Sequence, residues 1–166
     1  MNRFFASLIL ACPLAAYGAA NPDAAFFKHA AEGGLAEVDA GNLAQQKADA
    51  QNVKDFGAMM VKDHSAANEK LQSIATAKGI TLPSSPSVGQ MASKAKLDLL
   101  SGNAFDKSYI KGQVRAHEQT VGLFRKEIAS GLDTDAKAFA KETLPTVRSH
   151  LKAIKAIAAQ AGISTK

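Results

Sequence analysis

Three histidines are the residues of this sequence with the clearest chemical potential: His64, His117 and His150. Each lies in a segment whose apolar residues recur every three or four positions, which is the spacing of one face of an α-helix. His64 and His117 fall on these apolar faces, and His150 falls one position from one. Imidazoles on facing helices bind first-row transition metals. We therefore predict that the three side chains form a metal site, with Fe, Zn, Cu and Mn as the candidate ions.

Carboxylates supply the second class of candidate ligand. Asp63 and Glu118 are each adjacent in sequence to a histidine, about 100° around the helix, so each can bind only from the flank. Glu32 lies about as far before the first interhelical turn as His64 lies after it, and we expect the two to share a level. Glu37 is a further available carboxylate. Met60 lies one turn before His64, which would suit copper, although methionine more often fills gaps in a core.

A second interpretation of the same histidines assigns them no ligand role. Buried neutral imidazoles are also found as core residues held by hydrogen bonds. The protein would then be a non-enzymatic structural or interaction module of the cell envelope. Other chemistry has little support, because no strand-turn scaffold presents a nucleophile and Gly33-Gly34 lies within a helical pattern without a preceding strand.

Four long amphipathic segments must position these side chains. Helical periodicity and boundary signals predict helices over residues 21–47, 53–80, 104–131 and 133–158, and a short helix over residues 90–100. Asp49 is expected to cap the second helix, and close approach of a neighbouring helix is expected at Gly33-Gly34 and Gly41. Pro145 is expected to kink or break the last helix, because proline removes the bond to the Lys141 carbonyl.

The two halves of the chain repeat without a gap at a shift of 83 positions. The shift superimposes Asp23 on Asp106, Phe56 on Phe139, and Leu71 on Ile154. One helical hairpin is therefore used twice, joined by a long connection that contains the short helix. We predict an all-α, ferritin-like four-helix bundle in which the mid-helix residues of both halves meet near the centre.

The N-terminus has the order of a secretory signal peptide. Arg3 is followed by an apolar run from Phe4 to Tyr17 and by small residues at 18–20. Residues 1–20 are interpreted as this signal and residues 21–166 as a single bundle domain that is periplasmic or secreted. Lipid anchoring at Cys12, the only cysteine, is a minor alternative. No run of apolar residues elsewhere approaches the ~20 residues of a transmembrane helix.

The charge pattern argues against nucleic acid as a partner. The formal net charge of +5 falls to +4 once Arg3 is removed, and the lysines are interspersed with Asp and Glu. The chain has no Trp and only two tyrosines, so it lacks both a basic patch and a stacking platform. A metal ion is the partner that the residues favour; a protein partner and the oligomeric state stay open.

Several of these segments together resemble a bacterial family of exported proteins. The resemblance is carried by residues 60–68 (MVKDHSAAN), by Asp106-Lys107-Ser108-Tyr109 with His117 and Leu123-Phe124, and by Leu144-Pro145 with His150-Leu151. It covers roughly residues 24–162. The family is defined only as a domain of unknown function and is grouped with ferritin-like bundles, so the resemblance implies fold and export. Carboxylate-bridged ferritins carry Glu-x-x-His; here Val61 and Val147 occupy the Glu positions before His64 and His150.

Overall fold

Helices account for the secondary structure of residues 21–165, the part of the chain that this computed structural model describes; this part contains no β-strand. The predicted signal peptide and the alternative at Cys12 lie outside the described residues. The five helices are α1 (Ala24–Lys47), α2 (Gln51–Ala77), α3 (Val88–Asp98), α4 (Gly102–Ser130) and α5 (Thr134–Gln160). None of them is long and apolar enough to cross a membrane.

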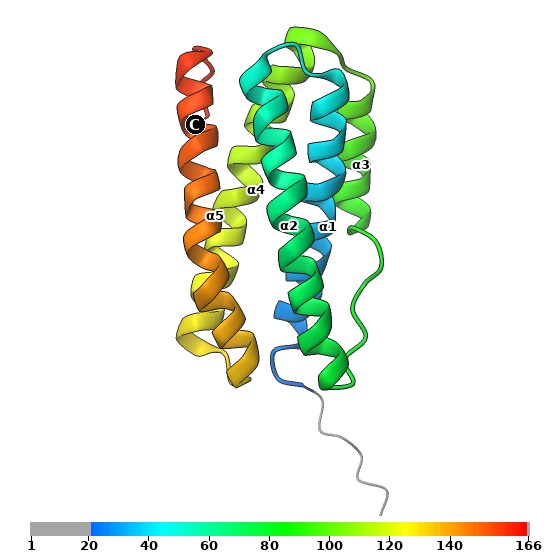
Figure 1. The fold of residues 1–166 in the computed structure, drawn as a ribbon, viewed down its shortest axis with the longest axis vertical. Coiled ribbons are helices and arrows are strands. Elements are labelled where there is room, and N and C mark those ends of the chain that lie inside the picture. Colours follow the sequence, from blue (N-terminus) through cyan, green and yellow to red (C-terminus); the bar gives the residue numbers. More distant parts are fainter. Residues whose placement is uncertain (1–20, 166) are drawn as a thin grey trace, which may run out of the picture.

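The helices form two antiparallel hairpins that lie side by side (Figure 1). α1 pairs with α2 and α4 with α5, and the hairpins meet where α1 packs on α4 and α2 on α5. The chain leaves the end of α2, runs back along the bundle through α3, and starts α4 at the opposite end (Figure 1). The predicted all-α bundle of two hairpins joined by a long crossover is therefore confirmed.

The helix boundaries lie within a few residues of the predicted ones. α2 ends at Ala77, and α4 starts at Gly102, whose φ of 56° is the left-handed conformation that favours glycine. α5 does not break at Pro145 but runs on through it. Leu144 and Val147, on either side of the proline, are both buried. We attribute the continuity to this packing, which outweighs the loss of one backbone hydrogen bond.

The turn between α1 and α2 is held by a residue from the other hairpin. The Asp106 carboxylate, in the first turn of α4, accepts hydrogen bonds from the backbone N–H groups of Asp49 (3.1 Å) and Ala50 (2.8 Å). The expectation that Asp49 caps α2 is wrong, because Ala50 is the N-cap and no side chain of the turn itself caps the helix. A carboxylate from a different element satisfies the free N–H groups instead.

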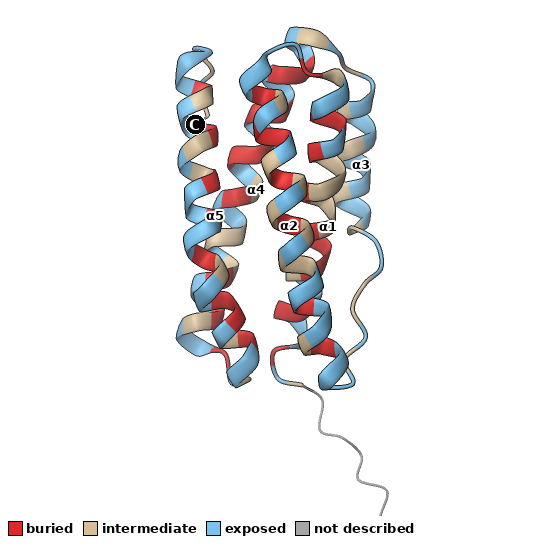
Figure 2. Ribbon diagram, viewed as in Figure 1, coloured by how far each residue is buried: buried red, intermediate tan, exposed pale blue. Residues whose placement is uncertain are grey.

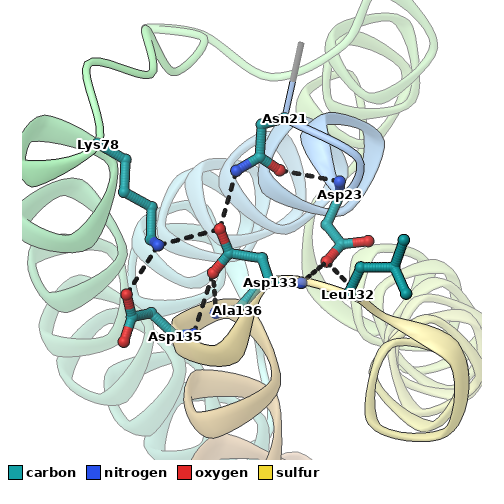
Figure 3. Close-up of polar contacts among 7 residues, drawn as sticks. All are labelled: Asn21, Asp23, Lys78, Leu132, Asp133, Asp135 and Ala136. Carbon is teal, nitrogen blue, oxygen red and sulfur yellow. Dashed lines mark hydrogen bonds and ion pairs between the residues drawn. The ribbon is translucent and has the colours of Figure 1, made fainter. Parts of the chain in front are cut away.

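The turn between α4 and α5 repeats this arrangement at the opposite end of the bundle. The Asp23 carboxylate accepts from the N–H groups of Leu132 (2.8 Å) and Asp133 (2.5 Å) (Figure 3). Asp133, the first residue of the predicted last helix, caps α5. Its carboxylate also accepts a hydrogen bond from the Asn21 side chain and forms an ion pair with Lys78. Asp23 and Asp106 are 83 positions apart, and so are the residues that they hold. The sequence repeat therefore appears in the structure as a pair of reciprocal caps.

Glycines bring α1 and α2 into close contact. A Cβ on Gly41 would lie 2.6 Å from the Gly57 carbonyl oxygen, and a Cβ on Gly57 would lie 2.8 Å from the Gly41 carbonyl oxygen. At Gly34 the added atom would overlap the side-chain amide of Asn68, whereas at Gly33 nothing lies within 4 Å. The predicted close approach is confirmed at Gly34 and Gly41 but not at Gly33.

The buried residues line the inward faces of the helices (Figure 2) and form two separate apolar clusters. The first cluster is centred on Phe56, Met60, Phe105, Tyr109 and Ile154. The second is centred on Phe26, Phe27, Leu71, Phe124 and Phe139. The residues named as the site below lie on the same helices between these two clusters in sequence, and belong to neither.

Candidate metal centre

His64 on α2, His117 on α4 and His150 on α5 come together inside the bundle. Their residues are 8%, 1% and 2% exposed, and one ring nitrogen of each lies within 4.8 Å of those of the other two. The ring centroids are 5.5–5.9 Å apart. His64 and His117 reach this position because they lie on the apolar faces of their helices, as predicted. His150, which the pattern placed at the edge of such a face, is equally buried.

Phe56, a member of the first apolar cluster, covers two of the three histidines. Its ring meets His117 edge-on at a centroid distance of 6.1 Å and His150 at 6.4 Å. Phe56 lies two turns before His64 on α2, so the face that presents the ligand also presents this cover. One side of the cluster is therefore closed by an apolar ring that offers no hydrogen bond.

Two of the histidines use one ring nitrogen for a hydrogen bond to an outer partner. His117 Nδ1 lies 2.9 Å from the backbone carbonyl of Gln113, which can only accept, so Nδ1 carries the proton. His150 Nε2 lies 2.9 Å from the Asp63 carboxylate and donates to it in the same way. Such outer bonds fix the tautomer and the ring orientation of metal-binding histidines. The second nitrogen of each ring is left with its lone pair.

These second nitrogens have no hydrogen-bond partner within residues 21–165. These atoms are His117 Nε2 and His150 Nδ1. His64 Nε2 is also buried without a hydrogen-bond partner in this range. Buried polar atoms in folded proteins are nearly always satisfied, and each exception requires an explanation. Three neighbouring histidines that each keep an unpartnered ring nitrogen are an arrangement that a bound cation would satisfy.

Burial favours the neutral form of two of the imidazoles. Burial first, and then the neighbouring His117 and His150, lower the pKa of His64 to about 3. The pKa of His150 is also lowered by burial, and the hydrogen bond to Asp63 opposes this shift without reversing it. His64 and His150 are therefore neutral at pH 7, and a neutral imidazole is the form that can coordinate a metal.

Glu37 on α1 is a buried carboxylate beside the histidine cluster. Its Oε1 lies 3.9 Å from His117 Nδ1, and its Oε2 has no partner in the described part of the chain. The residue is 6% exposed, and burial raises the pKa of Glu37, although His117 and Gln113 pull it down. Burial likewise raises the pKa of Tyr109. A polar layer thus continues from the histidines towards α1.

The other carboxylates predicted as ligands have different surroundings. Asp63 contacts His150 on the side of the ring that carries the outer nitrogen. Glu32 pairs within its own helix with His29 Nδ1 (3.3 Å) and Lys28 Nζ (3.9 Å). Glu118 is half exposed and pairs with Lys155 at 2.6 Å. Met60 is fully buried in the first apolar cluster. The structure thus groups the three histidines and Asp63, with Glu32 and Glu118 paired elsewhere.

The sequence analysis did not identify Gln113 as a site residue, and it named Glu37 only as one of several available carboxylates. Gln113 is four residues before His117, so its backbone carbonyl lies directly below the ring on the same face. The one sequence signal was therefore the i,i+4 spacing within the helix. Glu37 gave no such signal, because its approach to His117 depends on how α1 and α4 are packed.

Two solved structures of DUF305 proteins have the same fold. One is described as a putative secreted protein DUF305 from Streptomyces coelicolor, with a TM-score of 0.75 and 14% identity, covering 88% of this chain and 96% of that one. A DUF305 fragment from Deinococcus radiodurans has a TM-score of 0.73 and 11% identity, covering 83% and 95%. At these identities the likeness shows the fold alone.

Sequence comparison assigns the family more directly. No curated protein matches the chain. A family described as Domain of unknown function (DUF4142) matches residues 11–157, which is most of the chain and includes all three histidines. The resemblance drawn from the residues was to a family defined only in this way, and it is confirmed: the chain belongs to the DUF4142 family.

Proposed function

We propose that this protein binds one transition-metal ion through His64, His117 and His150. The observation that carries the proposal is twofold: each of the three buried histidines brings a ring nitrogen within 4.8 Å of the other two, and each has a ring nitrogen without a hydrogen-bond partner in residues 21–165. Asp63 and the Gln113 carbonyl act as outer partners that orient two of the rings. Glu32 and Glu118 are left out of the proposed ligand set because other residues occupy their carboxylates.

The donor set narrows the choice of metal. Three neutral imidazoles suit Zn, Cu and Fe better than Mn, which prefers oxygen ligands. Three protein ligands leave a fourth position free on a tetrahedral ion, the arrangement of catalytic rather than structural zinc sites. Redox or metal-detoxifying chemistry at this free position is the extension of the proposal. Asp63, which is hydrogen-bonded to His150, and the buried Glu37 beside His117 are the carboxylates that would offset part of the cation's charge.

We place this function in the periplasm or outside the cell. The support comes from the signal-like order of residues 1–20 and from a protein of the same fold that is described as secreted. Residues 21–166 would then be the working domain. Metal supply and metal toxicity are both problems that an exported binding protein meets directly.

A second candidate is an interaction module whose histidines only fill the core. One observation favours it: the crossover exposes large apolar side chains, with Val88 79% and Leu99 87% exposed. In this case the histidines need no ion, and their hydrogen bonds to Asp63 and Gln113 are the reason for their presence. The experiment below separates the two candidates.

The test compares the thermal unfolding of wild type, His64→Leu and His29→Leu, each without and with added Zn, Cu, Fe or Mn. A ligand that binds only the folded state stabilises it by about 2.7 kcal/mol at a hundred times Kd. We expect such a shift in wild type and in His29→Leu, whose imidazole is exposed, and none in His64→Leu. Metal analysis of protein purified without a His-tag gives the stoichiometry.

Two outcomes would contradict the proposal. A metal-induced shift of equal size in His64→Leu removes His64 from the ligand set. No shift and no bound metal in any of the three proteins rejects metal binding for these ions and favours the interaction module. Without metal, His64→Leu should be at least as stable as wild type, because the lost Nε2 has no partner in the described chain to leave stranded.

A further inference from the structure

A cavity connects the histidine cluster with the outside of the bundle. It lies between α1, α2, α4 and α5, and its lining runs from the exposed His29 to the buried Glu37 and His64. Of the three clustered histidines, only His64 lines it. The cavity therefore offers a path to the proposed metal centre from one side, while Phe56 covers two of the rings from another.

The cavity is small. Its volume of about 30 Å³ is room for roughly two or three water-sized positions, since one water needs about 10–15 Å³ of such space. Its walls are helix faces rather than loops: Ala67 and Asn68 on α2, Thr120 on α4 and Thr143 on α5 all line it. Side chains packed on rigid helices widen a passage only slightly, because interiors are close-packed. A ligand with a ring or a branched chain does not fit this space.

The inner end of the cavity carries unpartnered polar atoms. His64 Nε2 and Glu37 Oε2 belong to lining residues that are more than nine-tenths buried, and neither atom has a hydrogen-bond partner in residues 21–165. Closed apolar cavities stay empty, whereas a site with two or more polar partners binds water or a molecule of similar size. A metal held by His64 would therefore lie beside this cavity, whose lining also includes the carboxyl group of Glu37.

We propose that this cavity is the ligand entrance of the metal centre, and that it admits only molecules of two or three non-hydrogen atoms, of the class of peroxide, nitric oxide or azide. This inference rests on the proposed metal binding and adds the class of exogenous ligand. His64 brings the metal to the cavity, and Glu37 provides a hydrogen-bonding group for the far end of the small molecule. Substrates with a ring or a branched chain are excluded by size.

The test uses Co(II), whose visible absorption reports changes in its ligands. Protein loaded with one equivalent of Co(II) is titrated with azide, which has three non-hydrogen atoms, and with 4-phenylimidazole, which binds metals equally readily but is bulky. We expect azide to change the cobalt spectrum in a saturable manner and 4-phenylimidazole to leave it unchanged. Equal binding of both probes overturns the size limit, and binding of neither overturns the entrance.

A matched pair of variants locates the entrance. Ala67→Leu adds three carbon atoms inside the cavity, whereas Ala66→Leu adds the same atoms to the exposed face of the same helix. We expect azide affinity to fall at least tenfold in Ala67→Leu and to stay within twofold of wild type in Ala66→Leu, with cobalt stoichiometry unchanged in both. Undiminished azide affinity in Ala67→Leu overturns the proposed path.

The outcomes also separate this inference from the metal proposal. Wild type that binds no cobalt, measured by metal analysis, overturns both together. Wild type that binds cobalt through His64 but does not respond to azide overturns the entrance alone. If Ala67→Leu does not fold or does not bind cobalt, the two-probe comparison on wild type still decides, because it needs no variant.

Discussion

The hydrogen bonds of His117 and His150 determine which nitrogen of each ring is left for a metal. His117 and His150 each place one nitrogen on an outer partner, and the remaining nitrogens gather with that of His64. The outer partners differ: one is a backbone carbonyl and the other a carboxylate that is a third exposed. The carbonyl is fixed by the helix itself, so the tautomer of His117 is set by local structure, whereas that of His150 requires α2 to bring Asp63.

Glu127, near the end of α4, is a second buried titratable group whose surroundings favour the neutral form. Burial, together with the nearby carboxylates of Asp23 and Asp133, raises the pKa of Glu127 to about 7. A Cβ on Gly131 would overlap the Glu127 carboxyl group, so Gly131 makes the space for it. The positions 83 residues earlier are Ala44 and Ala48, which need no such space.

Glu127 should therefore make stability depend on pH. Between its unfolded pKa near 4.5 and its folded pKa of about 7, the folded state holds a proton that the unfolded state releases. Stability from this group is complete below pH 4.5 and is lost as pH rises through 7. Between pH 5 and pH 8 the free energy of unfolding of wild type should therefore fall. In Glu127→Gln, whose side chain stays neutral, this fall should be smaller by about 1–3 kcal/mol. Urea unfolding at both pH values measures this difference.

The exposed Glu69 provides the control for this measurement. Glu69→Gln should follow the wild-type pH dependence, because the Glu69 side chain is exposed and lies on a different helix from Glu127. Equal pH dependence in wild type and Glu127→Gln would contradict the assignment of the pH effect to this carboxyl group.

At the scale of the helices, the reciprocal caps are the feature that ties one hairpin to the other. Asp23 on the first hairpin holds the turn of the second, and Asp106 on the second holds the turn of the first. Each carboxylate satisfies two backbone N–H groups that a turn would otherwise leave without partners. The hairpins are therefore joined at both ends by polar contacts as well as along their apolar faces.

Removing either cap should destabilise the bundle to a similar extent. Asp23→Ala and Asp106→Ala each leave two backbone N–H groups without their partner, at a cost of about 1–3 kcal/mol. The caps lie at opposite ends, so the double variant should show the sum of the two costs within ~0.5 kcal/mol. Chemical denaturation of the single and double variants, with the exposed Asp55→Ala as control, measures this. A negligible cost at either position would show that the turn holds without its cap.

For the molecule as a whole, the repeat relates the two ends of the bundle. Leu71 lies in the second apolar cluster, and Ile154, its counterpart at the 83-residue shift, lies in the first. A twofold axis perpendicular to the bundle exchanges the ends in this way. The histidines do not obey it, because the counterparts of His64 and His117 are Val147 and Gly34. The centre is thus an asymmetric addition to a nearly symmetric frame.

The two clusters should contribute to one cooperative unit. Leu71 is 1% exposed and Ile154 is 0% exposed, so truncation to Ala at either site should cost about 2–5 kcal/mol, and the two costs should be alike. Both variants should unfold in a single transition when monitored by circular dichroism and by tyrosine fluorescence. Leu132→Ala, at a side chain that is 74% exposed, should cost little. Separate transitions for the two ends would contradict the single unit.

The sequence by itself determined the helices, their buried faces and the repeat. A period of 3.6 residues fixes which side chains share a face, so the inward positions of His64 and His117 followed from spacing alone. The 83-residue shift predicted that one hairpin is used twice. The prolines and the number of residues between the two hairpins predicted the long connection that the structure has between Ala77 and Gly102. These properties are local, or are comparisons of one local pattern with another.

Only the tertiary structure decided how residues on different helices meet. Periodicity sets the direction of a side chain but not the axial offset between two helices, which depends on close contacts such as that between Gly41 and Gly57. This offset brings Glu37 rather than Glu32 to His117. It also places Asp106 rather than Asp49 over the first turn. The sequence likewise did not show which histidine ring nitrogens lack a partner, because the packing of the helices determines which groups bond to the other nitrogens.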